Sequence, residues 1–232
     1  MQLIEVTDFG VRSAQVWLKR SGTPLRFVLF PMVHLGTNGF YAEVSWRLAD
    51  CQVIVMEGVR GRSAVVSALT AVYRIPGRRR GELMAQALNL PASGAVVINP
   101  DVDAAGFRTG WRRVPFAFRL AVLLLAPLLG IWLAVAGPKR VFWRSLETDD
   151  LPSREEVEAL AAGAAKLQEA MVDDRDQPLL RCLDGIHQSR SHEAIDVAIV
   201  YGAAHMRAVV EHLGARQGYW ATGAEWITVL PF

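Results

Sequence analysis

Cysteine is scarce in this sequence of 232 residues: only Cys51 and Cys182 are present, far apart and outside any Cys-x-x-Cys spacing. A disulfide framework and a thiolate zinc site are therefore not expected. No charge of one sign dominates, since the formal net charge is +2, and this balance predicts no nucleic-acid partner. The start of the chain has no basic stretch followed by an apolar one, so no cleavable signal peptide is expected.

Apolar residues are abundant: 52% of the chain is hydrophobic and 21% is charged. The length fits one domain that carries an insertion. We expect residues 1–110 to form the first half of an α/β domain and residues 146–232 the second half. Residues 111–145 then form an apolar helical insertion.

Short apolar runs at 25–31, 52–56 and 195–201 are typical of buried strands. A helix expected after Thr37 or Asn38 makes 25–57 a βαβ unit with parallel strands. Further expected elements are a pair of strands at 2–7 and 14–19, a strand at 96–98, helices at 63–73, 81–89, 154–171, 171–187 and 203–213, and a closing hairpin around Thr222-Gly223. These elements predict an α/β (α+β) fold: a central mixed sheet with parallel βαβ units and helices on both faces.

Three chemically active residues follow the three apolar runs. His34 follows the first run, Glu57 the second and His205 the third. The carboxyl ends of parallel strands meet at one edge of a sheet, where ligands of open α/β sheets bind. Two histidines and a carboxylate brought together there predict a metal site or an acid–base site.

These motifs also resemble the TraB/PrgY/GumN/Tiki superfamily, which opens with Gly-x-x-His, continues with a helix and a strand ending in Glu, and closes with a second Gly-x-x-His. The segments that carry the resemblance are Pro31-Met32-Val33-His34 with Leu35-Gly36, then Val53 to Gly58, and Gly202-Ala203-Ala204-His205. Arg175-Asp176 stands where the family places an Arg followed by Asn or Asp on a helix. Pro31 departs from the first motif, since it stands where that motif has Gly. Proline lacks the backbone N–H and excludes positive φ, so a turn that needs positive φ is not expected there.

The resemblance implies a metal-dependent hydrolase of the peptidase type, since Tiki-like members are metal-dependent proteases. It implies His34, Glu57 and His205 as metal ligands, Glu57 and Arg175 as catalytic residues, and Mn²⁺ or Co²⁺ as the ion. A divalent ion with open positions activates water and polarises a carbonyl. Without metal, the same residues could form an acid–base pair. The alternative is a non-catalytic regulatory protein that binds a peptide or a small anion. Pro31 favours this alternative, and so do the arginine clusters at 60–80 and 108–119.

Leu120–Gly137 runs for 18 residues without a charge, the lower limit for crossing a bilayer core. Arginine and lysine flank it on both sides, and a single crossing would divide the expected site between the two sides of a membrane. Pro127 and Gly130 interrupt the run. We therefore expect 114–137 to associate with the cytoplasmic face of a membrane as a helical hairpin or a kinked helix. The alternative is a helix that is buried in the protein or that forms a homodimer.

Overall fold

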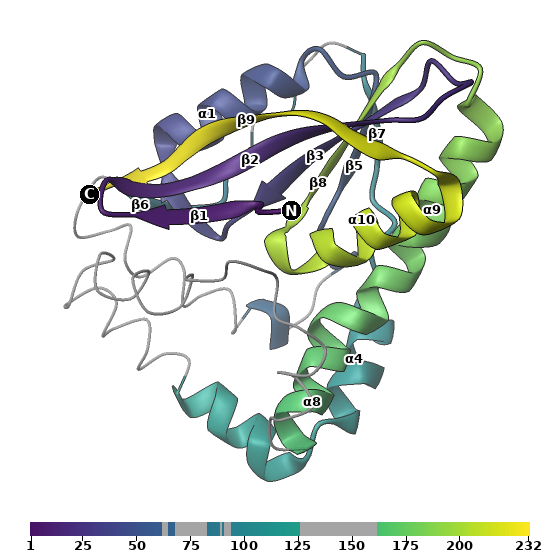
Figure 1. Ribbon diagram of the computed structural model, residues 1–232. Coiled ribbons are helices and arrows are strands. Elements are labelled where there is room, and N and C mark those ends of the chain that lie inside the picture. The colour runs from purple at the N-terminus through teal and green to yellow at the C-terminus, as the bar shows by residue number, and fades with distance from the viewer. Residues whose placement is uncertain (62–64, 68–82, 89, 91–93, 126–161) are drawn as a thin grey trace.

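The computed structural model describes residues 1–61, 65–67, 83–88, 90, 94–125 and 162–232 (Figure 1). It has a mixed α/β architecture in which helices cover both faces of a central sheet. The strands are β1 (Ile4–Thr7), β2 (Gly10–Lys19), β3 (Arg26–Met32), β4 (Leu35–Thr37), β5 (Val53–Met56), β6 (Leu83–Ala85), β7 (Val96–Ile98), β8 (Asp196–Gly202) and β9 (Trp220–Pro231). The helices are α1 (Asn38–Leu48), α4 (Ala104–Arg113), α8 (Ala162–Gln168), the π-helical η1 (Glu169–Asp173), α9 (Asp174–Arg190) and α10 (Ala203–Gln217).

The central sheet joins the two ends of the chain. Its strand order is β1-β2-β3-β8-β5-β7. β1 and β3 pair with successive parts of one edge of β2, and β9 pairs with its opposite edge. The neighbours β3, β8, β5 and β7 run parallel, whereas β1, β2 and β9 pair antiparallel. The parallel strands therefore all end at the same edge of the sheet, as the apolar runs predicted.

Side chains point alternately to the two faces of the sheet along the parallel strands, and this produces two hydrophobic cores. In β8, Val197, Ile199 and Tyr201 pack on one face, among side chains of α9 and α10. The intervening Ala198 and Val200 pack on the other face, among side chains of α1. Because every second residue points to the same side, strands that are buried on both faces have to be apolar throughout.

The helix α1 begins where the sequence predicted. The Thr37 side chain caps it by accepting a hydrogen bond from the Phe40 N–H at 3.2 Å. The buried residues of this helix are Phe40, Tyr41, Val44 and Leu48, whose spacing gives one apolar face. That face covers the sheet between β3 and β5 and completes the βαβ unit.

Two expected elements are wrong. The helix predicted over 81–89 is contradicted by β6, which pairs antiparallel with β4. The hairpin predicted around Thr222-Gly223 does not form, because β9 continues through these residues as one strand beside β2. In both places a neighbouring strand supplies backbone partners, which overrides the local turn and helix preferences.

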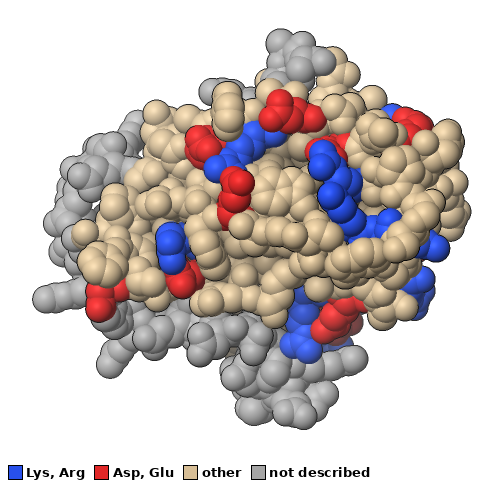
Figure 2. All heavy atoms as spheres, turned by 45° about the horizontal axis from the view of Figure 1, so that its top comes forward, with Lys and Arg blue, Asp and Glu red and all other residues tan. Residues whose placement is uncertain are grey.

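Part of the chain lies outside the described residues, including 154–161 of the helix expected over 154–171 and all of 126–137. In the described part of the apolar segment, residues 116–125 are helical. The helices among the described residues lack the combination of length and apolar character that crossing a bilayer requires. On the face shown in Figure 2, acidic and basic side chains are interspersed.

Candidate functional site

Glu57 follows β5 directly, and the structure places it between groups from both halves of the chain. Its Oε2 accepts a hydrogen bond from the Gly202 N–H at 2.7 Å, and its Oε1 accepts one from Arg175 Nη2 at 2.6 Å. Desolvation raises the pKa of Glu57, but hydrogen bonding and positive charge from His205 and Arg175, with the Gly202 N–H, hold it far below its usual range. The largely buried carboxylate is therefore ionised.

Gly202 allows the close approach of Glu57. A Cβ on Gly202 would lie 3.1 Å from Glu57 Oε2, which is closer than a side chain ordinarily allows. The φ angle of Gly202 is −52°, so its role is to leave space for the carboxylate, not to adopt a left-handed backbone. This explains the glycine of the second Gly-x-x-His motif.

Arg175, near the start of α9, is held by two carboxylates. Its Nε and Nη2 donate to the two oxygens of Asp101 at 2.9 and 2.6 Å, and Nη2 also donates to Glu57. Its Nη1 donates to the Met171 carbonyl at 3.1 Å. Asp101 is fully buried and accepts further hydrogen bonds from the N–H groups of Gly58 and Val102. The bidentate contact between Arg175 and Asp101 fixes the plane of the guanidinium group.

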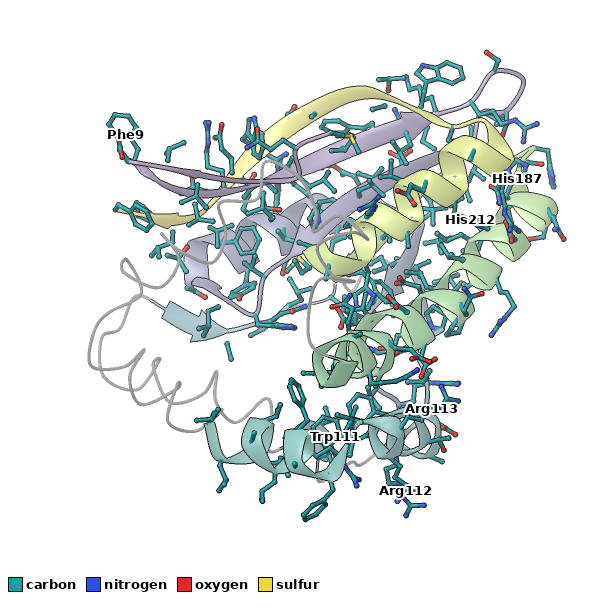
Figure 3. The ribbon with its side chains drawn as sticks, turned by 60° about the horizontal axis from the view of Figure 1, so that its bottom comes forward. Phe9, Trp111, Arg112, Arg113, His187 and His212 are labelled. Carbon is teal, nitrogen blue, oxygen red and sulfur yellow. The ribbon has the colours of Figure 1, made fainter. Side chains whose placement is uncertain are left out.

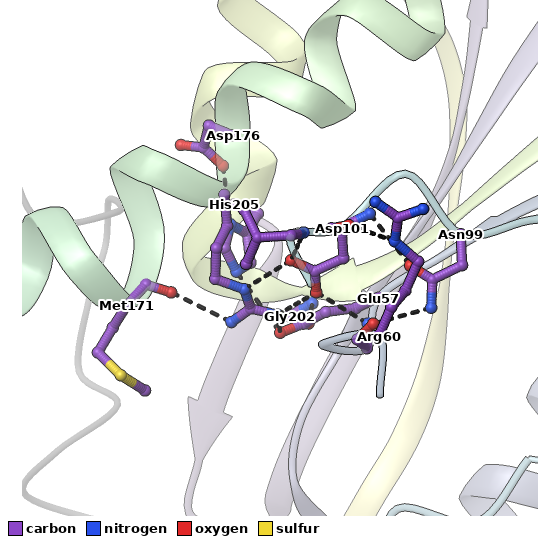
Figure 4. Close-up of polar contacts among 11 residues, drawn as sticks. Glu57, Arg60, Asn99, Asp101, Met171, Asp176, Gly202 and His205 are labelled. Carbon is purple, nitrogen blue, oxygen red and sulfur yellow. Dashed lines mark hydrogen bonds and ion pairs between the residues drawn. The ribbon is translucent and has the colours of Figure 1, made fainter. Parts of the chain in front are cut away.

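His205 lies in the first turn of α10 and is 3% exposed. Its Nδ1 is 2.7 Å from Asp176 Oδ1, and its Nε2 is 3.6 Å from Glu57 Oε1. Desolvation lowers the pKa of His205, but the hydrogen bonds and charges of Asp176 and Glu57 outweigh it and raise the pKa to about 9. Figure 4 shows His205 between Asp176 on α9 and the network around Glu57 and Asp101. The imidazole is thus oriented from one side and directed at Glu57.

His34 stands at the same edge of the sheet, but its side chain is exposed. Desolvation by nearby protein lowers the pKa of His34, Glu57 opposes this effect, and the positive charges of Arg175 and His205 add to it. The backbone on either side is anchored, because the Tyr41 hydroxyl donates to the Val33 carbonyl and the Gln86 N–H donates to the His34 carbonyl. His34 therefore presents an accessible imidazole beside a buried ionic cluster.

Pro31 is accommodated at the end of β3 without loss of pairing to β2. The register of β2 with β3 ends at Leu29, two residues earlier. The Ser13 hydroxyl instead donates to the Pro31 carbonyl at 2.6 Å. A proline is compatible with a strand where no ladder hydrogen bond needs its N–H.

The structure thus brings Glu57, Arg175 and His205 together from distant parts of the sequence. It adds two residues that sequence reasoning did not assign to the site. Asp101 follows the strand pattern of 96–98, but the sequence does not show that its carboxylate meets Arg175. Asp176 was part of the Arg175-Asp176 pair, but a sequence does not show that its carboxylate meets His205.

The donor set provides two groups with a suitable spacing for a metal ion. Two ligands of one ion lie roughly 3 to 3.5 Å apart, close to the distance between His205 Nε2 and Glu57 Oε1. Within the described part of the chain, however, no three His, Cys, Asp or Glu side chains form a group that could hold a metal ion. His34 does not complete such a group in this arrangement.

Comparison with protein-family models, with curated proteins and with solved structures finds no match to this chain.

Proposed function

We propose that this protein hydrolyses an amide or ester bond at the edge of the sheet occupied by His34, Glu57, Arg175 and His205. The observation that supports the proposal best is the buried line of contacts from Asp176 through His205 to Glu57 and Arg175. Buried ionised groups are costly, and clusters of them with strongly shifted pKa values concentrate at functional sites. The motifs shared with the TraB/Tiki group suggest the same class of reaction.

Each residue has a role that its surroundings support. His34 is accessible, and its lowered pKa keeps it neutral at neutral pH. It would accept a proton from the attacking water and return it to the leaving amine nitrogen or alcohol oxygen as the C–N or C–O bond breaks. His205 is protonated and held by Asp176, so it would stabilise negative charge that develops on the substrate carbonyl. Asp176 and Glu57 hold this positive charge in place, and Arg175 in turn fixes Glu57 by donating to its Oε1.

The test measures hydrolysis of nitrophenyl esters and of a peptide-amide panel by the full chain, with chelator, without additions, and with Mn²⁺ or Co²⁺. We expect turnover that falls at least about 100-fold in His34→Ala and in Glu57→Gln. His192→Ala is the matched control, because His192 is also an exposed histidine but lies outside the cluster. Circular dichroism establishes that each variant is folded.

Undiminished turnover in folded His34→Ala and Glu57→Gln would contradict the proposed site. Activity that appears only with Mn²⁺ or Co²⁺ would assign the chemistry to a metal-dependent hydrolase, as the resemblance implies. Equal activity in chelator would assign it to the acid–base pair.

The second candidate function is non-catalytic binding of a peptide or a small anion. It is favoured by the pairing of both Glu57 oxygens inside the protein, because a carboxylate engaged in this way is a weak base. Calorimetric titration with the peptide panel distinguishes the two. Tight binding without turnover under any metal condition would support this candidate and reject the hydrolase.

A further inference from the structure

The helical stretch 116–125 follows α4, and among the described residues it packs against the body through one face. Phe118 and Val122 on that face pack against a small hydrophobic cluster built from Phe107, Trp111, Val114 and Ala170. This cluster joins α4 to η1 and is separate from the two cores of the sheet. The stretch is therefore anchored while its other face is turned away from the protein.

The outward face of this stretch is apolar. The exposed side chains are Phe116 (71%), Leu120 (45%), Leu123 (37%), Leu124 (60%) and Leu125 (60%). Single exposed hydrophobic residues are ordinary on protein surfaces, but several contiguous ones mark an interaction site. Here five occur within ten residues, and the only charge in this stretch is Arg119.

Basic side chains on α4 lie next to this apolar face in the chain. Arg108 and Arg112 are exposed, and Figure 3 shows Arg112 pointing away from the body. Arg113 differs, since it forms ion pairs with Asp174 and Glu169. No acidic residue occurs between Asp103 and Glu147 in the sequence, so nothing in that part of the chain offsets the positive charge.

We propose that Arg108, Arg112, Phe116, Leu120 and Leu124 form a lipid-binding surface that inserts into the headgroup region of an anionic membrane. Apolar side chains of an interfacial helix enter the boundary between headgroups and acyl chains, while neighbouring arginines bind lipid phosphates. Each such cation adds attraction to an anionic leaflet. A lipid surface fits this combination because its acyl boundary accepts the apolar side chains while its phosphates pair with the two neighbouring arginines.

The experiment is co-sedimentation of the full chain with phosphatidylcholine vesicles that contain or lack phosphatidylserine. We expect binding to the anionic vesicles and at least about tenfold weaker binding to the neutral ones. Arg108→Gln combined with Arg112→Gln removes most of that preference. Leu124→Glu weakens binding to both kinds of vesicle, because it places a charge in the inserted face.

Two controls match these variants. Phe9→Ser removes a hydrophobic side chain that is 87% exposed and lies far from α4 in Figure 3. Arg181→Gln combined with Arg216→Gln removes two exposed arginines, one of α9 and one of α10. Both should bind as the unchanged protein does, and so should Glu57→Gln, which separates lipid binding from the proposed hydrolysis.

Three results would overturn the proposal. The first is no sedimentation with either kind of vesicle. The second is equal binding to neutral and anionic vesicles. The third is a dimer by light scattering that Leu124→Glu dissociates, because this would assign the surface to a second copy of the chain.

Discussion

At the scale of single residues, Asp176 controls the charge of His205. The carboxylate lies 2.7 Å from Nδ1 and leaves Nε2 facing Glu57. Such a carboxylate partner sets both the orientation and the basicity of an imidazole. The contribution of this contact to the free energy of unfolding depends on pH, because folding favours the protonated form of His205.

The folded pKa of His205 is raised from an ordinary value of 6.5 to about 9. Stability from this group is therefore fully present below about pH 6.5 and is lost as the pH rises through about 9. We expect the free energy of unfolding to fall over that window by up to roughly 3 kcal/mol. Urea unfolding at pH 6.5 and pH 9.5 measures the change.

Asp176→Asn is the matched variant, since it keeps the shape of the side chain and removes its charge. We expect it to unfold more easily at pH 6.5 and to lose less stability on going to pH 9.5. A decline as steep as that of the unchanged protein would show that another group causes the pH dependence.

At the scale of elements, the π-helical turn η1 places Arg175. The Asp174 N–H bonds to the Glu169 carbonyl five residues earlier, and the Met171 carbonyl within the turn accepts from Arg175. Widened turns of this kind are frequent at functional sites. On the opposite face of the sheet, α1 begins four residues after His34 and depends on its cap at Thr37.

Thr37→Ala removes the side-chain acceptor for the Phe40 N–H. We expect it to lower the free energy of unfolding by about 1 kcal/mol, measured by urea denaturation. Thr37→Ser should recover most of the loss, because the hydroxyl remains. Ser189→Ala, a change at an exposed helical position of α9, is the control. A loss in Thr37→Ser as large as in Thr37→Ala would contradict the capping role.

At the scale of the whole molecule, the sheet separates two cores. Leu183 of α9 belongs to the core on one face, and Leu48 of α1 belongs to the core on the other. Both are fully buried. Buried leucines of this kind leave a cavity when truncated, and the surroundings relax only in part.

We expect Leu183→Ala and Leu48→Ala each to lower the free energy of unfolding by about 2 to 5 kcal/mol. The double variant should show the sum of the two losses within about 0.5 kcal/mol, because the side chains share no core. The measurement is chemical denaturation of the unchanged protein, the two single variants and the double variant, which together form a double-mutant cycle. A coupling energy well above that margin would mean that the faces do not pack independently.

Local sequence patterns determined much of this protein. The continuous apolar runs of β3, β5 and β8 required strands buried on both faces, and the capped pattern after Thr37 required a helix between two of them. Parallel strands end at one edge, so the meeting of Glu57 and His205 also followed from the sequence. The physical reason is that burial of apolar side chains at a fixed period is a local property.

Only the tertiary structure decided the rest. β6 and the continuous β9 exist because neighbouring strands supply hydrogen-bond partners from far along the chain. The double contact of Asp101 with Arg175 and the contact of Asp176 with His205 join residues 74 and 29 positions apart. Side-chain direction at such distances depends on how helices pack on the sheet, and no short segment of sequence contains that information.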